Sequence, residues 1–322
     1  MPHSAGIVLA GGRSSRMGTP KAALEWHGST LLRRTTGILS RSTDGPVIVV
    51  RAAGQDLPAL PPGVEVVDDP HEGLGPLQGI AAGLAAVGGR APIAFVCSTD
   101  LPFLHPAFVR RMLRAIDRQD STADGDRPAV GLLSPGCEDS PAAGTGTTGG
   151  TGTAGESGHG GADVGLPVAR GFSQPLAAAY RTALAPLAGR LVAERRLRPA
   201  FLFEECTVAR LDEAALHADL VLAALDPDFD SVLNVNEPAD YQSARARPGP
   251  LITIRRSGSL ADDQRGPETV RAATVARAAA AAGIALDGQV GAALNGGQLT
   301  KDGETPLAAG DTVLFITTDA RG

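Results

Sequence analysis

Residues 7–21 read IVLAGGRSSRMGTPK. An apolar run, Ile7 to Leu9, leads directly into the paired glycines Gly11 and Gly12. Three cationic side chains follow the glycines: Arg13, Arg16 and Lys21. Glycines let a backbone approach a ligand closely and point successive N–H groups at one anion, and each charge-assisted hydrogen bond to a phosphate contributes about 1.5–3 kcal/mol. The stretch has neither GxGxxG nor the Lys-Ser/Thr of a P-loop, but it predicts a buried strand followed by a phosphate-binding loop rather than an ordinary strand-to-helix turn.

The segments around this loop predict an α/β fold. Three more short apolar runs, each bounded by Gly, Pro or Asp, are typical of buried strands: Val47 to Val50, Val64 to Val67 and Ile93 to Cys97. Pro106 opens a helical pattern with arginines on one face. The opposite face is apolar: Phe108, Val109, Met112, Leu113 and Ile116. Strands that alternate with helices predict a mostly parallel sheet with both faces covered.

Length and composition exclude several classes of protein. The 322 residues favour two domains, and 43% hydrophobic and 20% charged residues are typical of a soluble globular chain. A net charge of −6 argues against a protein that binds nucleic acid through a basic surface. The sequence has no run of 18 apolar residues and no signal-peptide pattern at its start. The three cysteines, Cys97, Cys137 and Cys206, are too few and too far apart for a disulfide framework or zinc cluster, which is typical of a cytoplasmic protein. Together with the charge and the lack of an apolar span, this predicts a cytoplasmic protein without membrane or nucleic-acid partners.

The pattern divides the chain into two predicted domains. The first spans residues 1–245 and is interrupted by residues 134–163, where ten of thirty residues are Gly. Such a segment buries too little surface to offset its ordering entropy, so we expect a disordered insertion. Residues 246–250 include two prolines and a glycine and are typical of a linker, and residues 251–322 form the second domain.

The second domain has the pattern of a small α+β module. We expect strands at Leu251 to Ile254, Val290 to Leu294 and Thr312 to Thr317. An alanine-rich helix is predicted from about Glu268 to Ala282, closed by Gly283. Turns are predicted at residues 295–297 and 301–303.

Two carboxylates in the first domain follow predicted strands. Asp69 comes after Val64 to Val67, and Asp100 comes after Ile93 to Cys97. Ligands of open parallel sheets bind outside the carboxyl ends of the strands, where both side chains would lie beside the glycine loop. Mg²⁺ is usually held by one or two carboxylates together with phosphate oxygens and water. Either aspartate could instead form a turn or cap a helix. The surrounding sequence STDLPF favours the metal site for Asp100.

Five motifs in order resemble the molybdenum cofactor guanylyltransferases, a MobA-like family of NTP transferases. They are Leu9-Ala10-Gly11-Gly12 with Arg16-Met17-Gly18 and Lys21, Gly75-Pro76-Leu77-Gln78-Gly79-Ile80, Asp100-Leu101-Pro102-Phe103, Gln174-Pro175-Leu176, and Asn234-Val235-Asn236-Glu237-Pro238. The resemblance covers roughly residues 5–245 apart from the insertion. It implies a Rossmann-like three-layer α/β/α domain and a Mg²⁺-dependent reaction that joins GMP from GTP to molybdopterin cofactor and releases pyrophosphate.

The resemblance also assigns roles to residues. Leu9, Ala10, Gly11 and Gly12 would hold the nucleotide, Lys21 its phosphates, and Asp69 the nucleoside. The loop with Gly75, Pro76, Leu77 and Gly79 would lie on the guanine side. Asp100 would ligate Mg²⁺, and Arg16, Lys21 and Asp100 would be the catalytic residues. Pro20 stands where guanylyl enzymes usually have Asp, and Pro-Lys also occurs in cytidylyl relatives, so transfer of CMP stays an alternative.

Residues 251–322 resemble the β-grasp (ubiquitin-like) sulfur carriers of molybdopterin and thiamine synthesis. The matching segments are Val290 to Gly296, Thr305-Pro306-Leu307 and Gly310 to Val313. Working carriers end in Gly-Gly, whereas this sequence ends in Ala-Arg-Gly. The resemblance therefore favours a docking or regulatory module over a carrier, with proteins of molybdenum cofactor synthesis or molybdoenzyme maturation as candidate partners.

Several other residues near these motifs have two interpretations or an ordinary one. His71 is expected to be a solvated loop residue and Cys97 a small buried hydrophobe. Either the acceptor's phosphate binds to Arg195, Arg196 and Arg198, or these residues lie at the solvated end of a helix. Asn234 and Asn236 either orient metal or acceptor or form a turn. The sequence thus predicts a guanylyltransferase, with a cytidylyltransferase, a nucleotide-sugar enzyme and a non-catalytic nucleotide-binding protein as alternatives.

Overall fold

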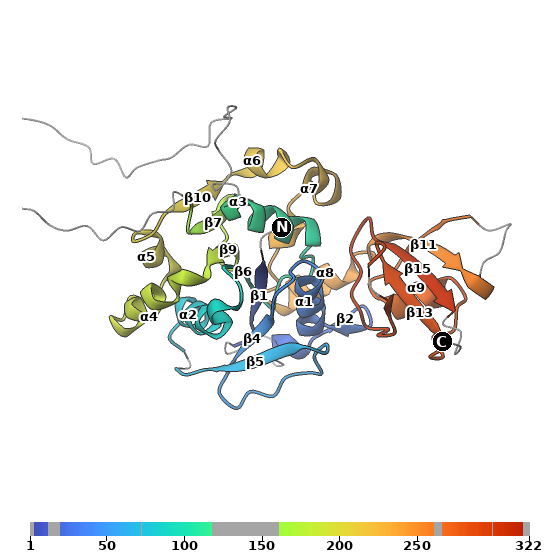
Figure 1. Cartoon of the computed structure of the whole chain (residues 1–322), viewed down its shortest axis with the longest axis horizontal. Coiled ribbons are helices and arrows are strands. Elements are labelled where there is room, and N and C mark those ends of the chain that lie inside the picture. Colours follow the sequence, from blue (N-terminus) through green and yellow to red (C-terminus); the bar gives the residue numbers. More distant parts are fainter. Residues whose placement is uncertain are drawn as a thin grey trace, which may run out of the picture.

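The computed structural model describes residues 3–11, 20–71, 73–117, 161–260, 266–297 and 299–317, and these ranges contain two large sheets (Figure 1). The predicted insertion therefore lies outside the described residues except for 161–163. Of these three, Asp163 accepts a hydrogen bond from Thr207 N at 2.9 Å. Gly12 and Arg16 also lie outside the described residues.

The main sheet has the strand order β10-β7-β9-β6-β1-β4-β5, with the short β8 paired to β7. Its strands are β1 Ser4–Leu9, β4 Val47–Ala52, β5 Val64–Asp69, β6 Ile93–Ser98, β7 Val164–Ala169, β8 Phe172–Ser173, β9 Ala177–Arg181 and β10 Val208–Leu211. The neighbours β5, β4, β1 and β6 are parallel, as predicted. β9 runs antiparallel to both β6 and β7, so the sheet as a whole is mixed.

Helices cover both faces of this sheet (Figure 1). They are α1 Leu31–Ser40, α2 Pro76–Val87, α3 Pro106–Asp117, α4 Ala185–Ala193, α5 Pro199–Phe203, α6 Glu213–His217, α7 Leu220–Leu225 and α8 Pro238–Ala246. Side chains alternate along each strand, so Ile7 faces the core under α2 and α4 while Val8 faces the core under α1 and α3. The three-layer arrangement expected from the sequence is present.

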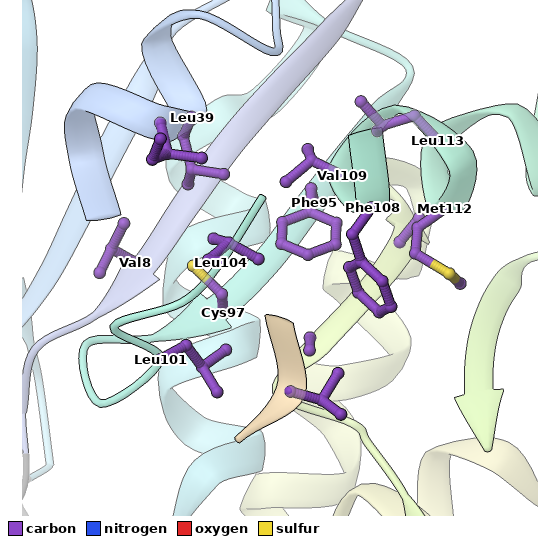
Figure 2. Packing of buried hydrophobic residues seen from close by; sticks show 14 of the residues in the cluster. Val8, Leu39, Phe95, Cys97, Leu101, Leu104, Phe108, Val109, Met112 and Leu113 are labelled. Atoms are coloured by element: carbon purple, nitrogen blue, oxygen red, sulfur yellow. The ribbon is translucent and has the colours of Figure 1, made fainter. Parts of the chain in front are cut away.

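The core under α1 and α3 shows why these segments fold together. The five apolar residues predicted for one face of α3 are all fully buried. Figure 2 shows Phe108, Val109 and Met112 gathered around Phe95 of β6, with Leu39 of α1 close to Val8 of β1. The rings of Phe95 and Phe108 meet edge to face with centroids 6.4 Å apart.

The C-terminal module, residues 251–317, has its own sheet in the order β12-β11-β15-β13-β14. Its elements are β11 Leu251–Ser257, β12 Glu268–Arg271, α9 Val275–Ala281, β13 Val290–Leu294, β14 Leu299–Thr300 and β15 Thr312–Thr317. β11 and β15 are parallel neighbours at the centre, and the other pairs are antiparallel. The three predicted strands are confirmed, and α9 packs on an apolar core of its own.

One prediction for this module is wrong. The helix expected from Glu268 begins only at Val275, because Glu268–Arg271 pair with β11 as a strand. Thr269 and Val270 are β-branched and fit a pleated strand. The side chain of Thr274 then caps the helix by accepting from Arg277 N at 3.3 Å. The predicted end is correct: Gly283, at φ +69°, follows the C-cap Ala282.

The module is docked on the main body, residues 3–246, mainly through α1. Arg33 forms ion pairs with Asp302 at 2.7 Å and Glu304 at 2.9 Å. Gly37 lies so close to Pro306 that an added Cβ would meet its ring at 2.6 Å. Ala308 is buried within the core of the main body. Figure 1 shows α1, α8 and the strand β2 (Glu25–Trp26) on the side of the main body that faces the module.

Candidate functional site

The direction of the chain connections reverses between β1 and β6. From β1 the chain moves to β4 and β5 on one side, and then crosses to β6 on the other side. Leu9 and Ser98, at the carboxyl ends of β1 and β6, are register partners, and Thr99 Oγ1 donates to Leu9 O at 3.1 Å. Open α/β sheets bind ligands in the crevice outside such a switch point. This edge is therefore where a ligand of the main sheet is expected.

The start of the glycine loop is fixed against β4. Ala10 N and Gly11 N both donate to Val50 O, at 2.8 Å and 3.3 Å, and Gln55 Nε2 donates to Ala10 O at 3.1 Å. A Cβ added at Gly11 would lie 3.3 Å from Ala52 N, so the glycine permits this close approach. Leu9, Ala10 and Gly11 thus lie at the switch point, the edge where a ligand of the main sheet is expected.

Lys21, Asp100 and Asn236 come together from three distant parts of the chain. Lys21 Nζ lies 2.9 Å from Asp100 Oδ2 and 3.0 Å from Asn236 Oδ1. The side chains of Lys21 and Asp100 are 22% and 16% exposed, so the pair is partly shielded but accessible. Lys21 opens a short 3-10 turn, Lys21–Ala23, directly after the loop. The structure therefore joins two predicted catalytic residues to an asparagine that the sequence left open.

Asp100 is held by its own neighbours. Its Oδ1 accepts from Ser98 Oγ, and its carbonyl accepts from Val235 N at 3.0 Å. The second contact brings the segment with Asn236 to the end of β6. Both Ser98 and Asn236 belong to motifs that the sequence displayed, but their contact with Asp100 and Lys21 depends on tertiary packing.

The oxygen atoms around Lys21 are suited to a hard cation. One carboxylate and one amide oxygen converge on a single ammonium position. Mg²⁺ prefers such oxygens and completes its shell with substrate phosphates and water. Among the described residues, no group of three or more His, Cys, Asp or Glu side chains is placed to hold a metal. A cation here would therefore depend on the substrate for further ligands.

Asp69 lies on the same edge but far from Asp100. It is the last residue of β5, so the strand is two residues longer than predicted. Since β5 and β6 are separated by β4 and β1, three strand spacings place the two strands about 14 Å apart. Asp69 Oδ1 accepts from His71 N at 3.0 Å. This position is compatible with contact to a nucleoside and too distant for a metal ion shared with Asp100.

The loop with Gly75 becomes the start of α2. Gly75, at φ +86°, caps the helix, and Pro76 occupies its first turn; both are exposed. Leu77 is fully buried, and a Cβ at Gly79 would lie 3.2 Å from Leu9. Leu77 and Gly79 therefore serve helix-to-sheet packing, while Gly75 and Pro76 are exposed at the start of α2.

Four further candidate residues have ordinary surroundings. His71 is exposed, and Cys97 is fully buried, where desolvation raises the pKa of its thiol. Arg196 pairs with Glu204 at 3.1 Å and stacks over Phe201 at 5.0 Å. Asn234 is exposed. No helix in the described ranges is both long and apolar enough to cross a membrane.

Comparison with known proteins identifies the family of the main body. The family model described as "MobA-like NTP transferase domain" matches residues 6–208, more than half of the chain. A "Probable molybdenum cofactor guanylyltransferase" of Mycobacterium bovis (strain BCG / Pasteur 1173P2) is 42% identical over 120 residues, which are 36% of this chain and 58% of that protein. A protein of the same name from Mycobacterium avium (strain 104) is 43% identical over 108 residues, or 33% of this chain and 53% of that protein. The chain thus spans little more than half the length of the curated relatives that it matches.

Among solved structures, Rv0371c from Mycobacterium tuberculosis H37Rv has a TM-score of 0.50 with 17% sequence identity, over 76% of this chain and 98% of that chain. At this identity the likeness concerns the fold alone. The family match includes the glycine loop, Lys21 and Asp100. The chain belongs to the MobA-like NTP transferase domain family.

Proposed function

We propose that this chain is a nucleotidyltransferase that joins GMP from GTP to molybdopterin cofactor and releases pyrophosphate. The observation that carries the proposal is the convergence of Lys21, Asp100 and Asn236 at the switch point, next to the glycine loop. The names of the curated relatives support the guanylyl donor and the acceptor.

The residues have separable tasks in this proposal. The backbone around Gly11 approaches the nucleotide, and the ammonium of Lys21 neutralises charge on its phosphates. An acceptor phosphate oxygen attacks the α-phosphorus, the bond from that phosphorus to the β-phosphate breaks, and pyrophosphate leaves. The chain needs no covalent nucleophile, because positioning and charge neutralisation carry phosphoryl chemistry.

Asp100 and Asn236 are the residues that would hold Mg²⁺. The metal would supply charge neutralisation at the phosphates during transfer. Ser98 donates to one carboxylate oxygen of Asp100 and keeps it oriented, and Asn236 Oδ1 accepts from the ammonium of Lys21.

The C-terminal module is proposed to be a β-grasp domain. Numbered from β11, its sheet order is 2-1-5-3-4, with the first and last strands parallel at the centre and one helix between the second and third strands. The extensive docking on α1 supports a structural role of the module beside the transferase site. We propose no carrier activity for it.

The test is incubation of the purified chain with each labelled nucleoside triphosphate, Mg²⁺ and molybdopterin, with pyrophosphate and the dinucleotide product as readouts. We expect product with GTP and none with Asp100→Ala, which should keep its fold by circular dichroism. Product with CTP and none with GTP would show that the enzyme transfers CMP from CTP instead of GMP from GTP. Near-normal turnover of Asp100→Ala would refute the metal assignment, and no product with any triphosphate would favour a binding protein.

A further inference from the structure

Each of the three segments that supply the site continues into the joint with the C-terminal module. After Lys21 comes the hairpin of β2 and β3 (Ser29–Thr30), where Ser29 Oγ contacts Glu304 of the module at 3.4 Å. After Asp100 comes the loop of residues 101–105, whose last residue reaches the module. After Asn236 comes α8, which leads into the linker and β11. Figure 1 shows α8 and β2 between the main sheet and the module.

Arg34 of α1 connects the Asp100 loop directly to the module. Its guanidinium is buried, with Nε donating to Pro102 O and Nη1 donating to Leu307 O at 3.1 Å. Pro102 is two residues after Asp100, and Leu307 belongs to the module. Desolvation lowers the pKa of Arg34 to about 10, which leaves the side chain charged at neutral pH. The Arg34 guanidinium thus bridges the loop of residues 101–105, here called the Asp100 loop, and the module through two main-chain carbonyls.

His105 makes a second connection at the end of the same loop. Its Nδ1 accepts from Ala107 N at 3.1 Å, so Nε2 carries the proton and donates to Ala309 O at 3.0 Å. The loop between Asp100 and α3 is therefore tied to the module at Pro102 and at His105.

The loop has one side in the core and one side at the joint. Leu101 and Leu104 are buried in the core of the main body. On the other side lies a cavity of about 200 Å³ at the joint, and its walls include Arg34, Pro102, Phe103, His105, Arg247 and Ala309. The hydrogen bonds of Arg34 and His105 thus link the loop to the module on the side that borders this cavity.

Arg41 offers a contrast within the same interface. It lies at the other end of α1, donates to Pro306 O at 2.6 Å and pairs with Asp311 at 2.6 Å. Arg41 thus also binds the module through its guanidinium. The two arginines differ in that Arg34 also binds the Asp100 loop.

We propose that Arg34 is a positioning residue, through which the docked C-terminal module sets the place of Asp100 for metal and nucleotide binding. The inference rests on the proposed function, since it assumes that Asp100 holds the cation. The module is then a working part of the transferase site.

The test uses Mn²⁺ as the probe and measures free Mn²⁺ by electron paramagnetic resonance in the presence of GTP, with the full chain. Arg34→Met removes both donors at similar side-chain length, and Arg41→Met is the matched control. We expect Arg34→Met to weaken Mn²⁺ binding by about tenfold, as loss of a group that orients a metal ligand does, and Arg41→Met to stay within about twofold of wild type. Arg34→Lys keeps a cation and can donate to one carbonyl, so its Mn²⁺ affinity should lie between those of wild type and Arg34→Met.

Thermal unfolding of each variant separates positioning from loss of structure. Equal loss of Mn²⁺ affinity in Arg34→Met and Arg41→Met would overturn the inference, because the module would then act only as a scaffold. Unchanged affinity in a folded Arg34→Met would also overturn it. If Arg34→Met does not fold, wild-type affinity in Arg34→Lys overturns the inference and a reduced affinity supports it. Wild-type affinity in Asp100→Ala would instead show that the proposed metal site itself is wrong.

Discussion

Lys21 Nζ lies 2.9 Å from Oδ2 of Asp100, although 79 positions separate the two residues in the sequence. The glycine loop precedes the first residue, and β6 ends just before the second. The pair therefore joins the segment that follows the glycine loop to the carboxyl end of β6.

Lys21→Met should disable transfer without unfolding the protein. Loss of one preorganised donor to a developing charge costs about 10²–10³ in kcat. The ion pair is partly shielded, so loss of the donor to Asp100 should lower the free energy of unfolding by about 1–3 kcal/mol and leave the protein folded. Steady-state kinetics and urea denaturation measure the two quantities. A variant with normal kcat would contradict the role of Lys21.

Asn236→Ala should lower the transfer rate, because it removes an oxygen that holds the Lys21 ammonium in place. We expect a decrease of about tenfold, the value of one hydrogen bond to a charged group. Asn234→Ala is the matched control, since Asn234 is exposed two residues earlier in the same motif. The assignment fails if both variants have the same kcat.

Gly37→Ala should weaken docking of the module. The new Cβ would lie 2.6 Å from the Pro306 ring, and such overpacking costs about 1–3 kcal/mol. Gly189→Ala in α4 has open space around the new Cβ and should stabilise the chain by up to about 1 kcal/mol. Chemical denaturation compares the two substitutions. Equal effects would show that helix propensity, rather than the contact with Pro306, decides the outcome.

Phe108→Ala should destabilise the main body by about 3–5 kcal/mol, because it leaves a cavity beside Phe95 in the core of Figure 2. Phe172→Ala is a control of the same type at a side chain that is 73% exposed. Its effect should remain within about 0.5 kcal/mol. A small loss for Phe108→Ala would mean that α3 repacks.

Stability should decrease on mild acidification through His105. Burial lowers the pKa of His105 below its ordinary 6.5, while the Ala309 carbonyl, Asp226 and Asp311 oppose this shift and Arg34 adds to it. The folded chain therefore favours neutral His105: its contribution is complete above pH 6.5 and is lost as the pH falls from 6.5 toward the folded-state pKa. His105→Gln keeps an N–H donor and does not titrate.

The measurement is the free energy of unfolding of wild type and His105→Gln between about pH 7.5 and 5.5. Burial raises the pKa of Asp226, which acts with the opposite sign; because Asp226 and His105 interact, the difference between the two proteins reports His105 together with its effect on Asp226. The wild-type curve should fall more steeply. Parallel curves would show that groups other than His105 cause the pH dependence of stability.

Local patterns sufficed for the elements that bury one clear face. The strands β1, β4, β5 and β6 and the apolar face of α3 follow from short-range periodicity, and so does the position of Asp100 at a strand end. The site as a group did not follow from the sequence, because Asn236 reaches Lys21 through tertiary contacts of the preceding Val235, which donates to Asp100 O and packs with Trp26 and Leu31. Strand β12 was mistaken for helix since its pairing with β11 outweighs the alanine-rich sequence that follows.

The docking loop of the module accepts hydrogen bonds through the carbonyls of Pro306, Leu307 and Ala309, whereas the donors are the side chains of Arg41, Arg34 and His105. Every amino acid carries a carbonyl, so these three hydrogen bonds depend on the side chains of the main body alone. The side chains of the module contribute through the ion pairs of Asp302, Glu304 and Asp311 and through the fit of Pro306 against Gly37. Substitutions at these module positions would therefore weaken docking, whereas the three carbonyl contacts place no demand on the side chains that carry them.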